Sequence, residues 1–208
     1  MILKRLVLIG AGGHSKSIID SLGNEFDFIG YVDENKTGFF YGKPIFGQKI
    51  SDVPNYESCV FFVSIGDNRV RTIWYERILS LGLSTVNIID KSAYISPTAS
   101  IGNGNFIGKN AVINADSIIG NNNIINTRAL VEHECVVGNN IHLSTGAILN
   151  GNVKVEDGAF LGSMSVCIGQ LTIGKGTIIG AGGVVTSNVP SNVTAVGVPV
   201  KIIKEHRE

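Results

Sequence analysis

Apolar side chains recur at every sixth residue through the second half of the chain. The series begins at Ile95 and ends at Val185 without a break in register. A period of six is neither the 3.6-residue period of a helix nor the alternation of a plain strand. It is typical of a β-solenoid in which each hexapeptide supplies one short strand and one turn. The sixteen members are Ile95, Ile101, Ile107, Ile113, Ile119, Ile125, Val131, Val137, Leu143, Leu149, Val155, Leu161, Cys167, Ile173, Ile179 and Val185.

The residues between these aliphatics support the same interpretation. Three hexapeptides, about 18 residues, close one triangular coil in which the aliphatic points inward. Glycine often follows the aliphatic directly, and Gly or Asn accepts the backbone dihedrals of a turn. The pattern predicts a prism of about five coils with no long inserted loop. A small side chain, suited to a corner, stands four residues after most aliphatics: Ala99, Ala111, Ser117, Ala129, Cys135, Ala147, Ala159, Ser165 and Thr177.

The first half of the chain alternates strand and helix patterns instead. An apolar run at 6–9 precedes the glycine turn "GAGG" and a helix expected from about Ser15. Further strands are expected to end at Asp33-Glu34 and at Gly66, with a helix over "RVRTIWYERILSLG" and a fourth strand over "STVNIID". This order predicts a small parallel α/β sheet, half of a Rossmann-like fold. We therefore expect an α/β domain at 1–90 and an all-β domain at 91–208.

Composition and charge narrow the classes of function. The 208 residues carry no formal net charge and contain no block of Lys or Arg, which argues against a nucleic-acid surface. No apolar stretch is long enough to span a bilayer, so we expect no membrane insertion and a cytoplasmic protein. The three cysteines, Cys59, Cys135 and Cys167, are odd in number and have no metal-ligand spacing. They are expected to be reduced and buried, and no metal is expected.

The glycine turn and the ends of the predicted strands indicate a nucleotide site. A glycine turn that opens a helix offers free N–H groups to a phosphate. "GAGG" lacks the last spaced glycine of the dinucleotide fingerprint, and the strands are too few, so a mononucleotide fits better than NAD. Asp33 can alternatively be an ordinary turn carboxylate. The expected lining is Gly12, Gly13 and His14 at the phosphate turn, Asp33 and Glu34 toward ribose or base, and Gly66 at a close approach.

Four stretches together resemble one family. "GAGGHSK", the hexapeptide half, "EHE" at 132–134 and the tail "VPSNVTAVGVPVKII" are similar to bacterial hexapeptide-repeat sugar acetyltransferases. That family includes N-acetyltransferases of nucleotide-linked 4-amino sugars and sialic acid O-acetyltransferases. The resemblance extends over the whole chain. It implies a left-handed parallel β-helix, a homotrimer with acetyl-CoA between neighbouring prisms, and a tail that helps to cover CoA.

The resemblance also implies roles for single residues. The histidine of "EHE", His133, matches the general base, and Glu134 matches the residue that raises its basicity. Acetyl transfer requires the attacking amine or hydroxyl to lose a proton, and imidazole is the usual base. Neighbours on a strand point to opposite faces, so the pair can cooperate only at a corner of the prism. Matches to the remaining family positions are Asn126 near the acceptor, and His142, Gly151, Ser163, Ala181 and Gly182 near acetyl-CoA.

These expectations combine into one functional prediction with open alternatives. The chain is expected to be an acetyl-CoA-dependent N-acetyltransferase acting on the amino group of a nucleotide-linked 4-amino-deoxy sugar. Sialic acid O-acetylation needs the same base and the same donor. A non-catalytic nucleotide-sugar-binding scaffold and a purely structural β-helix are further alternatives. For the single residues, the alternatives are a solvated surface residue at His133 and an exposed turn residue at His142. The nucleotide, the sugar and the glycan pathway stay open.

Overall fold

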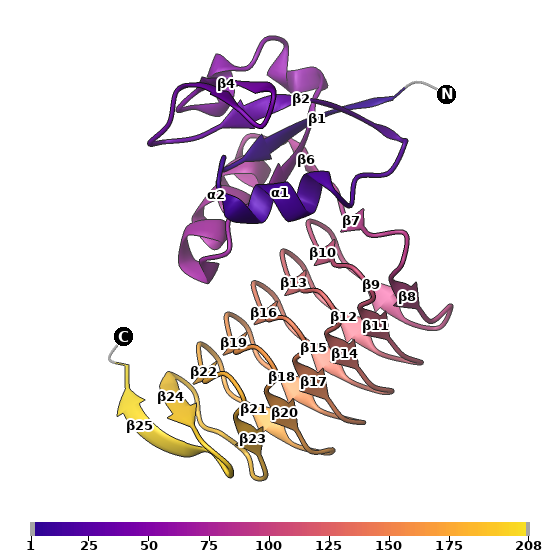
Figure 1. Ribbon diagram of the computed structural model, residues 1–208, viewed down its shortest axis with the longest axis vertical. Coiled ribbons are helices and arrows are strands. Elements are labelled where there is room, and N and C mark those ends of the chain that lie inside the picture. Colours follow the sequence, from indigo (N-terminus) through magenta and orange to yellow (C-terminus); the bar gives the residue numbers. More distant parts are fainter. Residues whose placement is uncertain (1–2, 207–208) are drawn as a thin grey trace.

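A triangular β-solenoid with an α/β unit seated on one side makes up the chain (Figure 1). The structure is a computed structural model that describes residues 3–206. Parallel strands of two residues follow one another at six-residue intervals and pair with the strand 18 residues later, for example Phe106 with Ile124. The second residue of each strand points into the prism, and this position stays the same from coil to coil because the strands and turns repeat in one register. The predicted solenoid and its unbroken register are confirmed.

The solenoid has three faces, which we name by their surroundings. The docking face lies under the α/β unit and comprises β7 (Ile88–Ile89), β10 (Phe106–Ile107), β13 (Ile124–Ile125), β16 (His142–Leu143), β19 (Phe160–Leu161) and β22 (Ile178–Ile179). The apolar face comprises β8 (Tyr94–Ile95), β11 (Val112–Ile113), β14 (Leu130–Val131), β17 (Ile148–Leu149), β20 (Val166–Cys167) and β23 (Val184–Val185). The open face comprises β9 (Ser100–Ile101), β12 (Ile118–Ile119), β15 (Val136–Val137), β18 (Lys154–Val155) and β21 (Thr172–Ile173).

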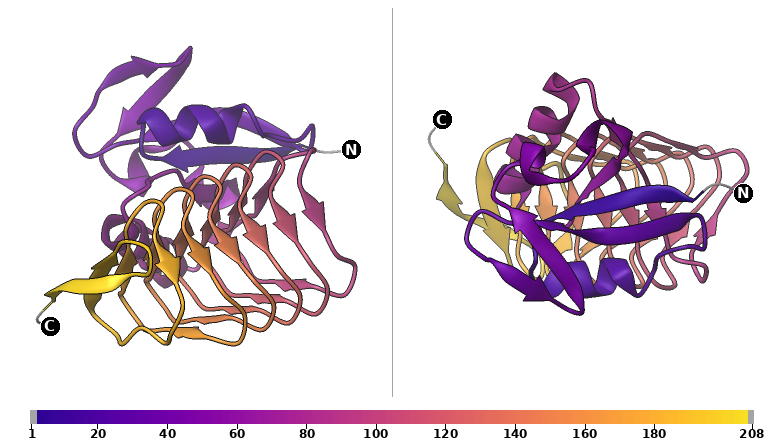
Figure 2. Two further views of the ribbon diagram at one scale, coloured as in Figure 1. Left: turned by 60° about the horizontal axis from the view of Figure 1, so that its bottom comes forward. Right: turned by 90° about the horizontal axis from the view of Figure 1, so that it is seen from above.

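A hairpin closes the C-terminal end of the prism. It consists of β24 (Val193–Val196) and β25 (Lys201–Glu205), which pair antiparallel next to β22. Figure 2 shows this hairpin at the end of the solenoid away from the first coil. Inside the prism, the aliphatics from Ile107 to Val185 are at most 2% exposed. The small residues four positions later, such as Ala111 and Ser165, are fully buried, so the predicted corner packing is confirmed.

The α/β unit is built on a six-stranded sheet. Its order is β3-β4-β2-β1-β5-β6, and all pairs are parallel except that of β3 with β4. The sheet pairs distant segments in the order typical of an α/β fold. The strands are β1 (Lys4–Ile9), β2 (Phe26–Val32), β3 (Gly38–Phe40), β4 (Lys43–Gly47), β5 (Val60–Val63) and β6 (Ser84–Thr85); the helices are α1 (Gly13–Ile19) and α2 (Asn68–Ser80), with 3-10 turns at Ile50–Asp52 and Tyr56–Ser58.

The structure corrects the sequence-based prediction at two places. The single strand expected over 84–90 is two strands: β6 joins the α/β sheet, whereas β7 pairs with β10 of the solenoid. The hexapeptide series therefore begins one step before Ile95. The β3–β4 hairpin was not predicted. In the structure, Tyr41 and Gly42 at its turn both have positive φ, which is typical of a tight hairpin turn.

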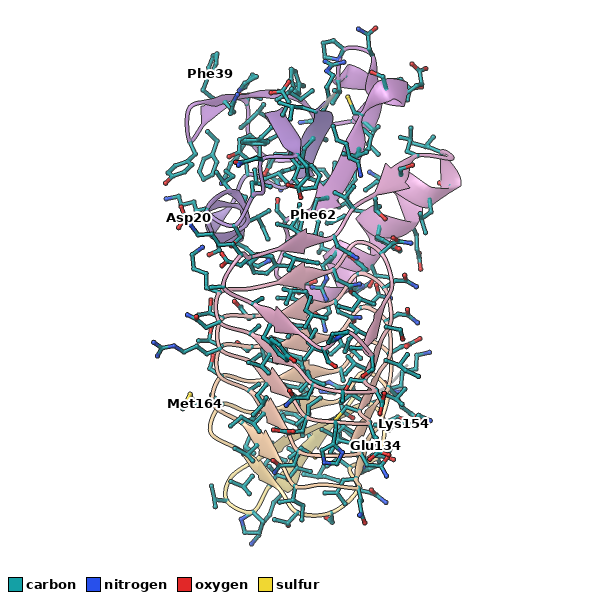
Figure 3. All side chains as sticks on the ribbon, turned by 90° about the vertical axis from the view of Figure 1, so that its right-hand side faces the viewer. Asp20, Phe39, Phe62, Glu134, Lys154 and Met164 are labelled. Atoms are coloured by element: carbon teal, nitrogen blue, oxygen red, sulfur yellow. The ribbon has the colours of Figure 1, made fainter. Side chains whose placement is uncertain are left out.

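The two faces of the α/β sheet are covered differently. One face packs against α2, and the other packs against α1 and the docking face of the solenoid. Leu6 and Phe62 of the sheet meet the outward side chains Ile88, Phe106 and Ile124, all of them 0–1% exposed. The two parts therefore share one core, and Figure 3 shows Phe62 above the first coils.

A buried carboxylate holds α1 to the first coils. Asp90, 5% exposed, accepts hydrogen bonds from Ser21 Oγ at 2.7 Å and Ser92 Oγ at 2.6 Å, and its Oδ2 lies 3.2 Å from Lys109 Nζ. Burial alone raises the pKa of the Asp90 carboxyl, but the bonds from Ser92, Ser21 and Lys109 outweigh it, and the net pKa lies well below the usual range. This network joins residues of both halves of the chain.

We expect Asp90→Ala to lower the free energy of unfolding by about 2 kcal/mol, because it strands buried donors. Asp20→Ala is the matched control. Its carboxylate is 66% exposed and 3.6 Å from the same ammonium, so its loss should cost below about 0.5 kcal/mol. Because the folded pKa of Asp90 is depressed, its contribution is present at neutral pH and is lost as the pH falls below about 3.9, the unfolded value. Urea titration at several pH values measures both effects, and equal losses in the two variants would contradict the account.

Candidate active site

The six residues predicted for nucleotide binding line one pocket. It lies at the carboxyl ends of β1, β2 and β5, the usual position of ligands in an open α/β sheet. Its volume is about 300 Å³, and Ile65, Val70 and Trp74 supply an apolar wall. The structure thus brings these predicted residues together: Gly12, Gly13, His14, Asp33, Glu34 and Gly66.

The glycine turn presents N–H groups to this pocket. α1 begins at Gly13, two residues before the expected start. Gly12 and Gly13 have open space where a Cβ would stand, so a ligand can approach their backbone closely. The N–H groups of Gly12, Gly13 and His14 have no acceptor among the described residues, as expected where a helix begins.

Asp33 shapes the turn. Its Oδ2 accepts the N–H of Ala11 at 2.7 Å, and its Oδ1 accepts the N–H of Asn35 at 2.9 Å. Each oxygen is therefore already engaged by the backbone, and only remaining lone pairs can serve a ligand. Glu34, in contrast, is half exposed at the mouth of the pocket, 3.5 Å from Arg77. It is the freer of the two predicted carboxylates.

Two histidines meet between the pocket and the docking face. His142 is 8% exposed on β16, so the alternative of an exposed turn residue is wrong. Its Nδ1 lies 3.2 Å from the carbonyl oxygen of Gly66, and its Nε2 lies 3.3 Å from Nδ2 of Asn126. The ring centroid of His14 is 6.5 Å away, and His14 Nε2 is buried without a partner among the described residues. His142 thus joins the pocket to Asn126.

Both imidazoles are held neutral. Burial, followed by the charge of Arg71, lowers the pKa of His14 to about 4. The same two causes, in the same order, lower the pKa of His142 to about 4. The neutral form is the one that accepts a hydrogen bond at one nitrogen while donating at the other.

We expect acid to destabilise the protein through these two groups. Their folded pKa values lie below the unfolded value of 6.5, so between pH 6.5 and about 4 the unfolded chain binds more protons. Stability therefore rises with pH across this window and is lost as the pH falls through it. The urea midpoint should drop between about pH 7 and pH 4, and less steeply in His142→Phe. Identical slopes in both proteins would contradict this assignment.

His133 and Glu134 lie at the corner between the apolar face and the open face. Glu134 has a φ of +60°, in the left-handed region. The same conformation recurs at the equivalent position of neighbouring coils. The turn removes the strand geometry that would separate the two side chains, and His133 Nδ1 lies 3.0 Å from Glu134 Oε2. The ring is 59% exposed. The prediction that the pair can meet only at a corner is confirmed in its geometry.

Two glycines lie in the coils next to His133 at the same corner. A Cβ on Gly151 would stand 2.6 Å from Nε2 of His133, and one on Gly169 would stand 2.9 Å from the carbonyl oxygen of Gly151. The N–H of Gly151 donates to no acceptor among the described residues. The corner beyond His133 is therefore bare backbone for two coils. Gly169 was missed by sequence analysis, although its distance of two coils from His133 was a usable signal.

The other predicted cofactor residues lie at a different corner. Ser163, Ala181 and Gly182 follow β19 and β22, between the docking face and the apolar face. Asn126 lies at this corner too, after β13. Figure 3 shows Met164, of this corner, and Glu134 at opposite edges of the prism. Within one chain, His133 and the pocket are thus not brought together.

The cysteines, possible metal ligands and possible membrane-spanning helices relate to three of the sequence-based expectations. All three cysteines are free and buried. Within residues 3–206, no three His, Cys, Asp or Glu side chains gather as metal ligands. No helix in the same range has the length and apolar character needed to cross a bilayer.

Two family descriptions match the chain. Residues 5–78 match the PglD N-terminal domain, and residues 98–133 match the bacterial transferase hexapeptide with six repeats. An uncharacterized protein of Acanthamoeba polyphaga mimivirus is 46% identical over 101 residues, which cover 47% of this chain. The chain matches only 20% of the length of that relative.

Solved structures match almost the whole chain. A mutant of perosamine N-acetyltransferase from Caulobacter crescentus, in complex with CoA and GDP-perosamine, is 39% identical, with a TM-score of 0.90 and coverage of 96% of this chain and 97% of that one. The acetyltransferase domain of PglB from Neisseria gonorrhoeae, in complex with acetyl coenzyme A, is 31% identical, with a TM-score of 0.92 and coverage of 97% and 100%. Two-part architecture, left-handed β-helix and sequence agree over this length. The chain belongs to the bacterial family of hexapeptide-repeat sugar acetyltransferases.

Proposed function

We propose that the protein is an acetyl-CoA-dependent N-acetyltransferase for the amino group of a nucleotide-linked 4-amino-deoxy sugar. The observation that carries the proposal is the His133–Glu134 pair, whose atoms Nδ1 and Oε2 are 3.0 Å apart beside bare glycine backbone. The relative solved with GDP-perosamine supports an amine acceptor over the hydroxyl of sialic acid. The intact pair argues against a non-catalytic scaffold. We place the protein in the cytoplasm.

The two parts of the chain divide the work. Residues 1–90 bind the nucleotide, with phosphates at the N–H groups of Gly12, Gly13 and His14 and the base toward Glu34 and the apolar wall. Residues 91–208 bind acetyl-CoA and carry the base. His14 is neutral, so it meets the ligand through hydrogen bonds and not through charge. Asn126 lies near the acceptor, His142 lies between Asn126 and the pocket loop at Gly66, and Ser163, Ala181 and Gly182 lie on the side of the donor.

The geometry suits direct transfer. A carboxylate on Nδ1 keeps the proton of a neutral imidazole on that nitrogen and leaves Nε2 as the base. The amine attacks the thioester carbonyl and forms the C–N bond, the carbonyl π electrons move to the oxygen as an oxyanion, and Nε2 takes the proton of the amine. The carbonyl then re-forms as the C–S bond breaks and the thiolate of CoA leaves. The thiolate of CoA then takes the proton from the imidazolium. The free N–H of Gly151, next to Nε2, is suited to stabilise the oxyanion.

A homotrimer would complete the site. The outward residues of the apolar face are all apolar, from Tyr94 to Val184. Three apolar faces around a threefold axis place each corner with His133 against the corner of the next subunit that carries Asn126. Such a heterologous contact closes into a ring. Each site would then combine His133 of one subunit with the pocket and Asn126 of its neighbour.

The proposal is tested by thermal unfolding with GDP, UDP, dTDP, CMP and acetyl-CoA added singly. A ligand that binds only the folded state at 100 times its Kd stabilises by about 2.7 kcal/mol. We expect one nucleotide and acetyl-CoA each to raise the Tm. Sialic acid alone should not. No shift with any nucleotide would refute the nucleotide-linked acceptor, and a shift with sialic acid alone would favour O-acetylation.

Gly151→Ala is expected to lower kcat by about 10²-fold, because its Cβ would overlap the imidazole of His133. The backbone φ of Gly151 is not positive, so alanine is tolerated there, and the exposed ring can swing aside without loss of the fold. The double variant with His133→Ala should be no slower than His133→Ala alone, since both remove the same base. Steady-state rates of the three variants measure this. Additive losses would show that Gly151 does not act through His133.

A further inference from the structure

A buried arginine connects the pocket to the solenoid. Arg71 of α2 is 1% exposed, and none of its hydrogen-bond partners is a carboxylate. Burial lowers its pKa to about 10, so the guanidinium stays charged at neutral pH. Sequence analysis gave it no role. It donates to the carbonyl oxygens of Ile65, Gly66, Asn122, Asn140 and Ile141 and to Oδ1 of Asn68, at 2.8–3.4 Å.

These acceptors lie on both parts of the chain. Ile65 and Gly66 belong to the loop that lines the nucleotide pocket. Asn122 and Asn140 lie 18 residues apart, on successive coils at the corner between the open face and the docking face. One guanidinium therefore fixes the pocket loop relative to two coils. Asn68 adds a third coil, because its Nδ2 donates to the carbonyl oxygen of Gly158 at 3.0 Å.

The carbonyl oxygen of Gly66 also determines the tautomer of His142. It accepts from Arg71 at 3.2 Å and lies 3.2 Å from Nδ1 of His142. Since a carbonyl oxygen has no hydrogen to give, Nδ1 must carry the proton. The neutral ring then has a lone pair on Nε2. Asn126 Nδ2, at 3.3 Å, donates to it.

The amide of Asn126 is thereby oriented. Its Oδ1 accepts the N–H of Thr127 at 2.8 Å, and one of its two Nδ2 hydrogens is used by His142. The second hydrogen remains for a ligand at the corner between the docking face and the apolar face. If His142 took the other tautomer, an N–H would face the amide N–H, and Asn126 would turn its oxygen there instead.

We propose that Arg71 is a positioning residue for acetyl transfer. Through the carbonyl of Gly66 it fixes the tautomer of His142, and His142 makes Asn126 a hydrogen-bond donor to the substrate. The groups with charge or titratable protons around His142 are Arg71 and His14. This inference rests on the proposed function, because it needs a substrate at Asn126. It adds a chain of hydrogen bonds from the nucleotide pocket to the reacting groups.

Arg71→Lys tests the inference, with Arg69→Lys as the matched control. Lysine keeps the charge but has three donors for six acceptors, whereas Arg69 is exposed on the same helix. At saturating substrates and well below the Tm, we expect Arg71→Lys to lower kcat by about ten- to hundredfold. The KM for acetyl-CoA should change little, and Arg69→Lys should match the wild type. If Arg71 only held the two parts of the chain together, Arg71→Lys would lower the Tm and leave kcat unchanged.

A double-variant cycle separates positioning from general damage. Asn126→Ala removes the end of the chain, so Arg71→Lys should cost no further kcat in that background. If Arg71→Lys fails to fold, His142→Phe serves instead. It keeps the edge-on contact with Phe160, whose centroid is 5.1 Å away, and removes both nitrogens. It should lower kcat as much as Asn126→Ala does, again without additivity.

Two results would overturn the inference. One is a folded Arg71→Lys or His142→Phe variant with the kcat of the wild type. The other is a loss in either variant that adds to the loss in Asn126→Ala. A wild type that consumes no acetyl-CoA with any nucleotide-linked amino sugar would instead refute the proposed function, so the two failures are distinguishable.

Discussion

His133→Ala should lower kcat by about 10² to 10⁴-fold, the usual loss when a general base is removed. The fold should be unaffected, because the ring is 59% exposed and lies outside the aliphatic core. Rates at saturating acetyl-CoA and sugar, with the Tm of each protein, measure the effect. An alanine variant with near-full kcat would remove His133 from the mechanism.

Glu134→Gln is the matched companion of this variant. It keeps the size of the side chain and a hydrogen bond to Nδ1 but removes the charge that stabilises the imidazolium. We expect a smaller loss of kcat than for His133→Ala, because in the proposed mechanism Glu134 does not itself take the proton. A loss as large as that of His133→Ala would indicate that Glu134 is the base.

Ile148→Glu should dissociate the proposed trimer and lower kcat/KM by more than about 10²-fold, since a charge at the centre of the apolar face opposes its burial. Ile118→Glu is the control. Ile118 is 52% exposed on the open face, and its variant should sediment as a trimer with unchanged activity. Analytical ultracentrifugation at micromolar concentration gives the oligomeric state. A monomeric wild type would contradict the composite site.

Mixed trimers test the composite site independently. Trimers made only of His133→Ala subunits, or only of Asn126→Ala subunits, are each expected to keep only a small residual activity. In trimers refolded from an equal mixture, about a quarter of the interfaces join an intact His133 to an intact Asn126 of the neighbour. Activity should therefore return to about a quarter of the wild-type value. No recovery would show that both residues serve the same site within one chain.

The solenoid was predictable because its information is local and repeated. Each hexapeptide carries an apolar residue at the same inward position, and sixteen repeats of this pattern define the register. The strand β7 was misassigned because only two residues separate it from β6, so that "STVNIID" looks like a single strand. Periodicity could not tell which sheet each half of that run joins.

The site was predictable only in part, for a related reason. Turn chemistry and strand ends placed Gly12 and Gly66 in one pocket correctly, because the carboxyl ends of parallel strands meet at one edge. The contacts of Arg71 and His142 depend on how the α/β unit docks on the prism, which no local pattern encodes. From sequence alone, an arginine on a helix is expected to be a solvated surface charge. In the structure, Arg71 instead donates hydrogen bonds to five main-chain carbonyl oxygens.

Turnover with a matched pair of acceptors tests the central claim most directly. The pair is a 4-amino-deoxy sugar linked to the nucleotide that raises the Tm, and the same compound with a hydroxyl at that carbon, each incubated with acetyl-CoA. We predict that the amine consumes the thioester with saturation kinetics and gains one acetyl group on nitrogen by mass spectrometry, and that the hydroxyl compound does not react. Acetylation of the hydroxyl at an equal rate, or no consumption with either compound, would contradict the account.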